Sequence, residues 1–262
     1  MHPVQKPYPV QKLTATSLTL ERHPRMRVGP SVAVYVWQYP LRFAHWALVL
    51  SIVVLSVTGY YIHNPFIVGQ TKTPFLMGWF RFTHEAFAMV FITCFLIRFY
   101  LFFFGDRWAR WRSMVPIHKD RWTEMLEMIK FYLLIRPSPI AKIGHNAVAA
   151  LSYLGIYTLV FVEIVTGLVM FNWLGHFRLL TPLVGWIPRL VSIQEIRLIH
   201  FFLMYVFIAF GIVHVHMCLI VSGVEKRGLM DSIFTGYKNV PVDELEEDDR
   251  EAIAAARSHR VD

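Results

Sequence analysis

The sequence contains little cysteine and little charge. Only two of its 262 residues are cysteines, Cys94 and Cys218, and both lie in apolar runs. Two thiolates alone do not complete a zinc or iron–sulfur site, and nothing in their placement suggests a disulfide. Charged residues make up 17% of the chain and hydrophobic residues 55%, whereas a soluble domain is usually more charged and less apolar. The composition therefore excludes a thiol-based metal centre and argues against a soluble globular fold.

Four stretches are apolar over a length that could span a bilayer, which takes roughly 20 residues in a helix. No internal repeat accompanies them. We predict an all-α membrane protein, a four-transmembrane-helix bundle within a domain at residues 34–238. A tail at 1–33 and an acidic tail at 239–262 are expected to be disordered or to lie on the surface. The four predicted spans are approximately 43–62, 82–104, 146–170 and 198–222.

The positive charge is distributed unevenly between the segments outside the spans. Eight Lys and Arg residues lie in 105–144 and six in 1–44, but only one lies in 63–80 and two in 171–195. Positive charge stays on the cytoplasmic side of a membrane protein, so both termini and the 105–144 segment are predicted to be cytoplasmic. Topology accounts for the net charge of +8, and no nucleic-acid partner is expected.

Two segments between the spans have features of their own. Residues 120–139 place apolar side chains at helical spacing on one face, which predicts an amphipathic helix on the cytoplasmic surface that Pro137 ends. Residues 171–195 are rich in apolar and aromatic side chains. We expect this loop to fold over the outer ends of the helices or to form a docking surface there.

Histidine is the residue type that calls for an explanation inside the spans, because an unpaired imidazole in hydrocarbon is costly. His200 and His214 are fourteen residues apart, so they lie within about 40° of one helix face and about 21 Å apart along it. His216 lies about 160° from the face of His200. Six of the twelve histidines fall in or at the edges of spans: His45, His84, His145, His200, His214 and His216.

The predicted directions of the spans match these histidines by depth into two pairs. His84 and His200 both lie near the outer side, and His45 and His214 both lie toward the cytoplasm. Imidazoles from facing helices at one depth can bind the two axial positions of a haem iron inside a bundle. The alternative is that these histidines form interhelical hydrogen bonds or relay protons. Two depth-matched pairs favour two haems, and an iron with both axial positions filled would exchange electrons only.

The motif R-x-x-H occurs three times, with the arginine on the water side of the histidine each time. Residues at i and i+3 share one helix face, and guanidinium binds carboxylates such as haem propionates well. We therefore predict propionate contacts for these arginines, although each could instead mark a membrane boundary and extend its head group to the interface. The arginines are Arg42, Arg81 and Arg197, before His45, His84 and His200.

Across about residues 34–238 the chain resembles the b-type cytochrome subunit of membrane-bound nickel–iron hydrogenases, which is related to the cytochrome subunit of respiratory formate dehydrogenases. The combination of short motifs is more specific than any one of them. The matching segments are Pro40-Leu41-Arg42-Phe43-Ala44-His45-Trp46, Thr58-Gly59-Tyr60, Met77-Gly78-Trp79-Phe80-Arg81-Phe82-Thr83-His84, Gly144-His145-Asn146, Thr166-Gly167, His200, His214 and Gly236-Tyr237-Lys238.

The resemblance implies a subunit of the bacterial inner membrane. A periplasmic nickel–iron hydrogenase, with its large subunit and its iron–sulfur small subunit, would dock at the outer face. Electrons from hydrogen would pass to an outer haem b, then to an inner haem b, and then to ubiquinone or menaquinone. By the family match, His84 and His200 bind the outer haem and His45 and His214 the inner one. The chain would be an electron-transfer part of a hydrogen:quinone oxidoreductase and not a hydrogenase by itself.

Several residues have more than one possible role. His145 and Asn146 could donate hydrogen bonds at a quinone site, or they could cap the third span or contact a haem propionate. His216 is a weaker candidate for the quinone site. Arg98 could extend to the interface or bind an inner propionate, and Glu163, within the third span, is assigned no role.

Two other functions fit parts of the pattern. The haem ligands would suit the cytochrome subunit of a formate dehydrogenase or a thiosulfate reductase equally well. A proton channel or metal transporter could also use buried histidines, but such folds often have more spans and inverted repeats.

Overall fold

A computed structural model of the protein describes residues 31–67, 75–105, 110–111, 119–137, 147–175 and 178–241. The predictions for most of the two tails, and for His145 and Asn146, lie outside these residues. The division into a domain at 34–238 and two tails stays a prediction.

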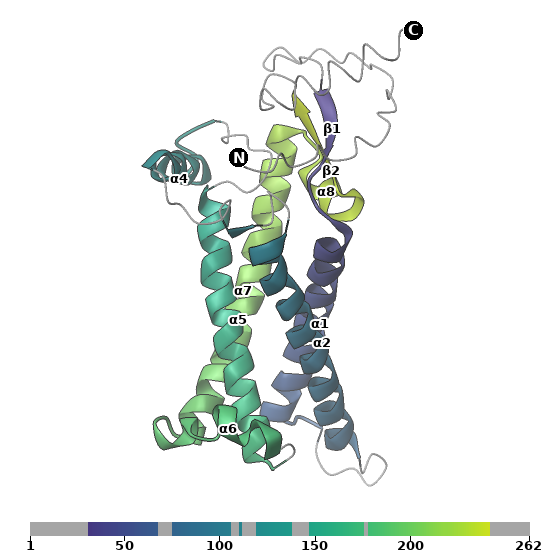
Figure 1. Ribbon diagram of the computed structural model, residues 1–262, viewed down its shortest axis with the longest axis vertical. Coiled ribbons are helices and arrows are strands. Elements are labelled where there is room, and N and C mark those ends of the chain that lie inside the picture. The colour runs from purple at the N-terminus through teal and green to yellow at the C-terminus, as the bar shows by residue number, and fades with distance from the viewer. Residues whose placement is uncertain are drawn as a thin grey trace, which may run out of the picture.

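Four long helices form the body of the protein and run alternately in opposite directions (Figure 1). Each is long and apolar enough to cross a membrane, which confirms the predicted helical membrane fold. The helices extend a few residues beyond the predicted spans at most ends, because each helix continues past the uninterrupted apolar run that predicts the span. The helices are α1 (Tyr39–His63), α2 (Leu76–Phe104), α5 (Ala147–Trp173) and α7 (Ile193–Glu225).

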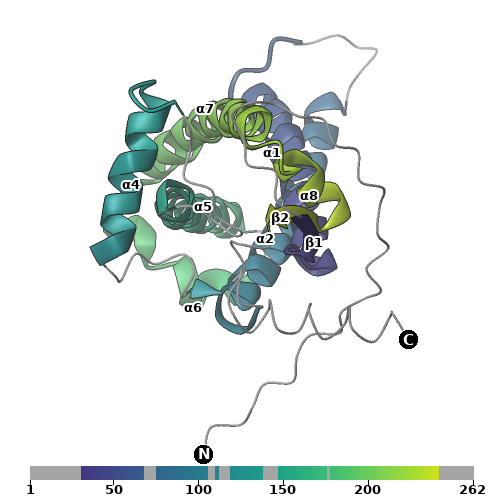
Figure 2. The ribbon, with the colours of Figure 1, turned by 90° about the horizontal axis from the view of Figure 1, so that it is seen from above.

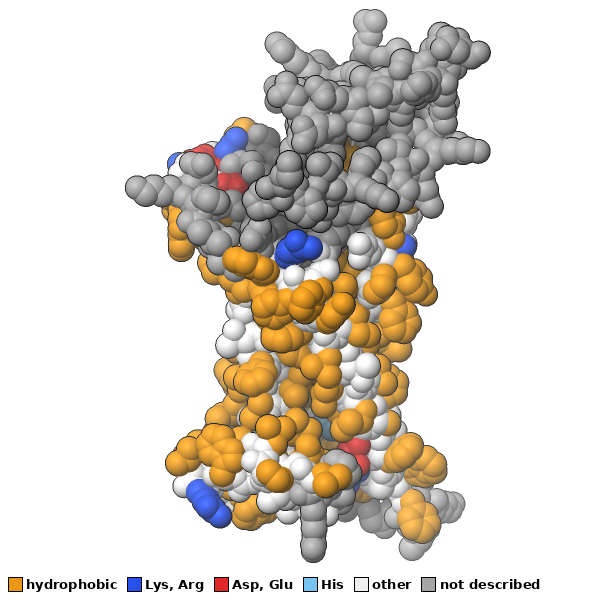
Figure 3. All heavy atoms as spheres, in the orientation of Figure 1, with side chains coloured by type: hydrophobic (Ala, Val, Ile, Leu, Met, Phe, Trp, Pro, Cys, Tyr) orange, Lys and Arg blue, Asp and Glu red, His pale blue; other side chains and the backbone are white. Residues whose placement is uncertain are grey.

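The outer surface of the bundle is apolar. At most 28% of the most apolar 18-residue window in each long helix is buried within the chain. On the face seen in the space-filling view, hydrophobic side chains cover much of the middle of the bundle, and the visible charged side chains lie nearer its two ends (Figure 3). Water would not solvate so large an apolar surface in a soluble monomer, so these faces require lipid.

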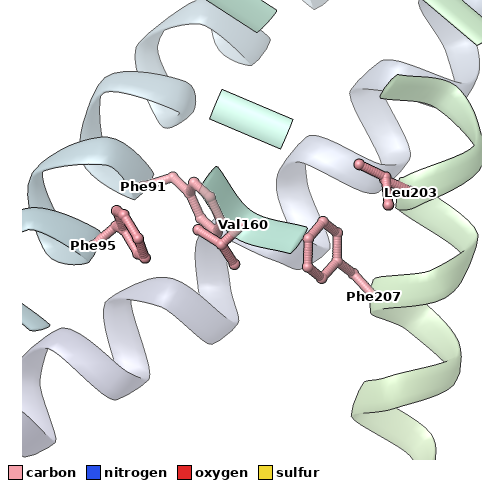
Figure 4. Packing of buried hydrophobic residues seen from close by; sticks show 5 residues of the cluster. All are labelled: Phe91, Phe95, Val160, Leu203 and Phe207. Atoms are coloured by element: carbon pink, nitrogen blue, oxygen red, sulfur yellow. The ribbon is translucent and has the colours of Figure 1, made fainter. Parts of the chain in front are cut away.

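The helices pack as two pairs, α1 with α2 and α5 with α7, and α1 also contacts α7. A cluster of apolar side chains joins the pairs near mid-height (Figure 4). Phe91 follows His84 by seven residues and Phe207 follows His200 by seven, so this layer lies about 10 Å along the bundle from that histidine pair. The cluster consists of Phe91, Phe95, Val160, Leu203 and Phe207.

The amphipathic helix predicted between the second and third spans is α4 (Lys119–Tyr132). It crosses one end of the bundle beside α5 and α7 (Figures 1 and 2). Met128 and Phe131 are buried against Val221 of α7, and the Glu124 carboxylate accepts a hydrogen bond of 3.0 Å from the backbone N–H of Ala147 at the start of α5. The helix ends earlier than predicted, because Leu134, with φ 62°, already leaves the helical conformation before Pro137.

A two-stranded sheet that the sequence did not predict holds the start of α1 at the same end. Strand β1 (Ser31–Tyr35) pairs antiparallel with β2 (Tyr237–Pro241), so the pair crosses both predicted domain boundaries. Helix α8 (Leu229–Thr235) precedes β2. Gly236, with φ 90°, connects α8 to β2. A Cβ at this position would clash with the ring of Tyr35. We call this end of the bundle the α4 end.

At the opposite end, the loop between α5 and α7 folds over the helix ends, as one of the two predictions for it stated. It contains the short helices η1 (Arg178–Leu180), α6 (Thr181–Val184) and η2 (Ile187–Arg189). Val184 is buried against Val169 and Ile196 of the two long helices. Ser192 and Glu195 form a reciprocal capping box that fixes the first residue of α7. We call this the α6 end.

Candidate functional site

The four histidines predicted as ligands form two pairs inside the bundle. The ring centres of His84 on α2 and His200 on α7 are 6.4 Å apart, and those of His45 on α1 and His214 on α7 are also 6.4 Å apart. The first pair lies toward the α6 end and the second toward the α4 end. Since His200 and His214 share one helix, the pairs are about 21 Å apart along it.

The spacing within each pair fits two imidazoles on opposite sides of one metal ion. An imidazole nitrogen binds a first-row metal at about 2 Å, and it lies about 1 Å from its own ring centre, so two opposed rings have centres about 6 Å apart. In the residues that the structure describes, no group of three or more His, Cys, Asp or Glu side chains could hold a bare metal ion. A macrocycle that supplies the remaining ligands itself needs only the two imidazoles, so the pairs fit haem.

Thr58 sets the protonation of His84. The Thr58 hydroxyl donates to the backbone carbonyl of Val54 at 2.7 Å, and its oxygen lies 2.9 Å from Nδ1 of His84. A hydroxyl has a single proton, so toward the imidazole it can only accept. Nδ1 of His84 therefore carries the proton, and Nε2 keeps the lone pair that a metal requires.

Thr166 performs the same task for His200. Its hydroxyl donates to the backbone carbonyl of Val162 at 2.9 Å, and its oxygen lies 3.0 Å from Nδ1 of His200. The glycines that follow the two threonines leave room for the rings. A Cβ at Gly59 would lie 3.2 Å from Cε1 of His84, and one at Gly167 would lie 3.3 Å from Cε1 of His200.

The pair toward the α4 end has a different surrounding. Nδ1 of His45 is buried and has no hydrogen-bond partner, although Trp46 meets the ring edge-on at 5.2 Å between centres. His214 stacks on Phe210 with 5.6 Å between ring centres, and Sγ of Cys218 lies 3.8 Å from its Nε2. This pair is thus positioned mainly by ring packing and lacks the threonine contact of the other pair.

The three arginines that were predicted to contact haem propionates differ in their hydrogen bonds and exposure. Arg42 donates from Nη1 to the backbone carbonyl of Phe234 in α8, and its Nε is buried without a partner. Arg81 and Arg197 are exposed. Their predicted contact with propionates stays a prediction. His216 is exposed on α7 and does not join the interior pairs, as its helical angle predicted.

Sequence reasoning gave no role to Thr58 and Thr166, which the structure places on the histidines. Each threonine precedes a glycine in the later part of a span. The span after Thr58 carries His84, and the span after Thr166 carries His200. The repetition of this pair in the first and third spans is the signal that could have suggested a shared task.

Comparison with known proteins shows the family to which the chain belongs. Residues 36–236 match the family described as prokaryotic cytochrome b561. A protein of Azotobacter vinelandii is 34% identical over 219 residues, covering 81% of this chain and 91% of the relative. A protein of Escherichia coli strain K12 is 30% identical over 215 residues, covering 79% and 92%. These relatives are named "Probable Ni/Fe-hydrogenase B-type cytochrome subunit" and "Probable Ni/Fe-hydrogenase 1 B-type cytochrome subunit".

Family membership implies a b-type haem and, with the four apolar helices, a multi-pass membrane protein. The chain belongs to the prokaryotic cytochrome b561 family, among sequences similar to the B-type cytochrome subunits of Ni/Fe-hydrogenases.

Proposed function

We propose that the chain holds two b-type haems, one above the other, and conducts electrons across the bacterial inner membrane from a nickel–iron hydrogenase to quinone. The observation on which this rests is the presence of two interhelical histidine pairs with the same 6.4 Å separation of ring centres. His84 and His200 would hold the outer haem, and His45 and His214 the inner one. When bound, each haem would supply one-electron redox chemistry.

The charge distribution supports an orientation with the α6 end outside and both termini in the cytoplasm. The outer end would then be the docking side for the iron–sulfur small subunit and, with it, the large subunit of the hydrogenase. The folded loop there exposes apolar side chains that such a partner could cover. They are Leu174, Leu179, Leu183, Trp186 and Leu190.

The quinone would accept electrons near the α4 end, next to the inner haem. Exposed His216 is compatible with a site open to lipid, and His145 and Asn146 remain the other proposed donors at this site. Arg42, Arg81 and Arg197 are proposed propionate contacts. Whether ubiquinone or menaquinone is used does not follow from these residues.

The names of the relatives favour the hydrogenase over the formate dehydrogenase and thiosulfate reductase alternatives. The paired threonines fix the tautomer of each histidine, with the proton on Nδ1 and the lone pair on Nε2. This is the arrangement expected of a metal ligand.

The test is purification of the native complex in mild detergent. A nickel-containing subunit should co-purify, hydrogen should reduce the b-type haem bands, and added quinone should reoxidise them. In His214→Ala, hydrogen should still reduce the remaining haem while quinone reduction falls severely. His63→Ala is a matched control, since exposed His63 lies outside both pairs. A complex that contains no nickel, or haem bands that hydrogen leaves oxidised, would contradict the proposal.

A further inference from the structure

Arg98 is a buried arginine on α2. Only 7% of the residue is exposed, so its side chain does not extend to the membrane interface, which was one of the two roles considered for it. Its Nε and Nη2 donate to the Tyr157 hydroxyl at 3.1 and 2.6 Å, and its Nη1 has no hydrogen-bond partner. None of the described carboxylates pairs with Arg98. The guanidinium is therefore buried with a free donor and without a counter-charge.

A buried guanidinium in this state requires an anion. Moving an unpaired charge out of water is very costly, and buried polar groups in proteins are nearly always hydrogen-bonded. The hydroxyl of Tyr157 accepts two of the hydrogen bonds of Arg98 but does not balance its charge. Guanidinium binds carboxylates and phosphates especially well. The site therefore favours an oxyanion that the described part of the chain does not supply.

Tyr157 adds a second donor to the same site. A phenol hydroxyl that accepts hydrogen bonds still has one proton to donate, and this proton has no acceptor in the part of the chain that the structure describes. The ring of Tyr157 lies edge-on to Phe95 and Phe102, about one turn on either side of Arg98, with 6.0 and 6.4 Å between ring centres. The hydroxyl of Tyr157 and Nη1 of Arg98 are thus both free to donate to one carboxylate.

Helices α1 and α2 keep one antiparallel register along the bundle. Near the α6 end, the Thr58 hydroxyl lies 2.9 Å from Nδ1 of His84. Near the α4 end, Leu41 and Leu101 are buried in one cluster. Leu41 comes seventeen residues before Thr58, and Leu101 comes seventeen residues after His84. The two contacts therefore have the same register, which holds for the residues between them.

This register places Arg98 level with the inner histidine pair. Arg98 follows His84 by fourteen residues on α2, and His214 follows His200 by fourteen residues on α7. Both Arg98 and His214 therefore lie about 21 Å toward the α4 end from the outer pair. On α1, the same step back from Thr58 leads to the residue next to His45.

At this level, each of the four long helices contributes a side chain to the interior of the bundle. His45 of α1 and His214 of α7 have ring centres 6.4 Å apart. Arg98 of α2 and Tyr157 of α5 are joined by the hydrogen bonds between them. A haem held by the histidine pair has two propionate carboxylates, which are oxyanions of the kind that the arginine and the tyrosine favour.

We propose that Arg98 and Tyr157 bind a propionate of the haem held by His45 and His214. The inference rests on the proposed function, because it requires a haem at that pair. Arg98 supplies the positive charge and the free Nη1 donor, and Tyr157 supplies a second hydrogen bond. Two opposed imidazoles define an axis but leave a macrocycle free to rotate about it. The carboxylate contact fixes this rotation.

The test is resonance Raman spectroscopy of the full-length protein with both haems bound, because the propionate bending vibration reports hydrogen bonding at the carboxylates. Arg98→Gln should shift part of this band to lower frequency, since one propionate loses a charged donor. Tyr157→Phe should shift it in the same direction by a smaller amount. Arg98→Lys keeps a charged donor and should restore much of the wild-type band.

Release of haem to apomyoglobin gives a second readout. Arg98→Gln should release the inner haem roughly 10–100-fold faster than wild type, the range that corresponds to one hydrogen bond to a charged group. The outer haem should leave at the wild-type rate. The inner haem is identified as the one that His214→Ala lacks. In His214→Ala itself, adding Arg98→Gln should change neither the Raman band nor the release rate, because the propionate is no longer there.

Two matched controls remove the same chemical groups elsewhere. Arg136→Gln deletes an arginine at the α4 end that pairs with Glu127. Tyr100→Phe removes the hydroxyl of a tyrosine on α2 that is 60% exposed. Both controls should keep the Raman band and the two release rates of wild type.

The outcomes separate this inference from the proposed function. If Arg98→Gln keeps two haems with an unshifted band and wild-type release rates, Arg98 has a structural role only and the inference alone is overturned. Faster release of the outer haem, or a shift that persists in His214→Ala, would also overturn it. A wild-type protein without a haem at the inner pair would overturn the proposed function and the inference with it. If Arg98→Gln does not fold, Tyr157→Phe decides, since it keeps the guanidinium.

Discussion

The threonine contacts yield a prediction whose size follows from the geometry. In Thr58→Val the side chain keeps its shape but loses the oxygen that lies 2.9 Å from Nδ1 of His84. The Nδ1–H would then lose this acceptor, and a hydrogen bond of this kind contributes about 0.5–1.5 kcal/mol. Loss of the group that hydrogen-bonds a ligating histidine typically lowers metal affinity by roughly 10–100-fold. This range corresponds to about 1.4–2.7 kcal/mol of binding free energy. We expect Thr58→Val to weaken binding of the outer haem within this range.

The assay is the transfer of haem from the detergent-solubilised protein to an excess of apomyoglobin, followed optically. Thr58→Val should release one haem faster than wild type and the second at the wild-type rate. Thr166→Val, which removes the 3.0 Å contact to His200, should affect the same haem. Thr58→Ser retains the hydroxyl and should behave like wild type. Equal loss of both haems, or no change in either valine variant, would refute the assignment of the threonines to the outer pair.

Three further predictions follow from the same contacts. In Gly167→Val, a Cβ only 3.3 Å from Cε1 of His200 should displace the ring, and the haem-to-protein ratio should fall from two toward one; Gly155→Val, at a glycine with open space around it, should keep both haems. The inner haem should be lost first under increasing detergent, since Nδ1 of His45 lacks a hydrogen-bond partner; spectra showing that the outer haem leaves first would contradict this. Gly236→Ala should lower the thermal midpoint, because the position has φ 90° and no room for a Cβ; an unchanged midpoint would show that the strand pair does not hold α1.

The positions of the helices and of the four histidines could be predicted because they depend on local properties. Apolar runs have the length that a bilayer demands, and a helix has a fixed rise and angle per residue. The offset between His200 and His214 thus indicates two depths from the sequence alone. The alternating direction of the spans then matched each depth to a histidine on another helix.

Other features depend on contacts between distant parts of the chain. The strands β1 and β2 pair across about two hundred residues, with no turn between them that could indicate a hairpin. The face of α4 that packs on the bundle also depends on its neighbours. The apolar residues of α4 do not all face the bundle: Trp122 and Leu126 are exposed, and Met128 is buried. The contact of Glu163 with His200 likewise required the packing of α5 against α7.

The most direct measurement of the central claim is the number of haems per chain, determined as the pyridine haemochrome against protein mass. We predict two haems in wild type and one in both His84→Ala and His214→Ala, with different absorption bands retained in the two variants. His216→Ala should keep two haems, since His216 lies outside both pairs. A single haem in wild type, or the loss of the same haem in both alanine variants, would contradict the arrangement of two stacked sites.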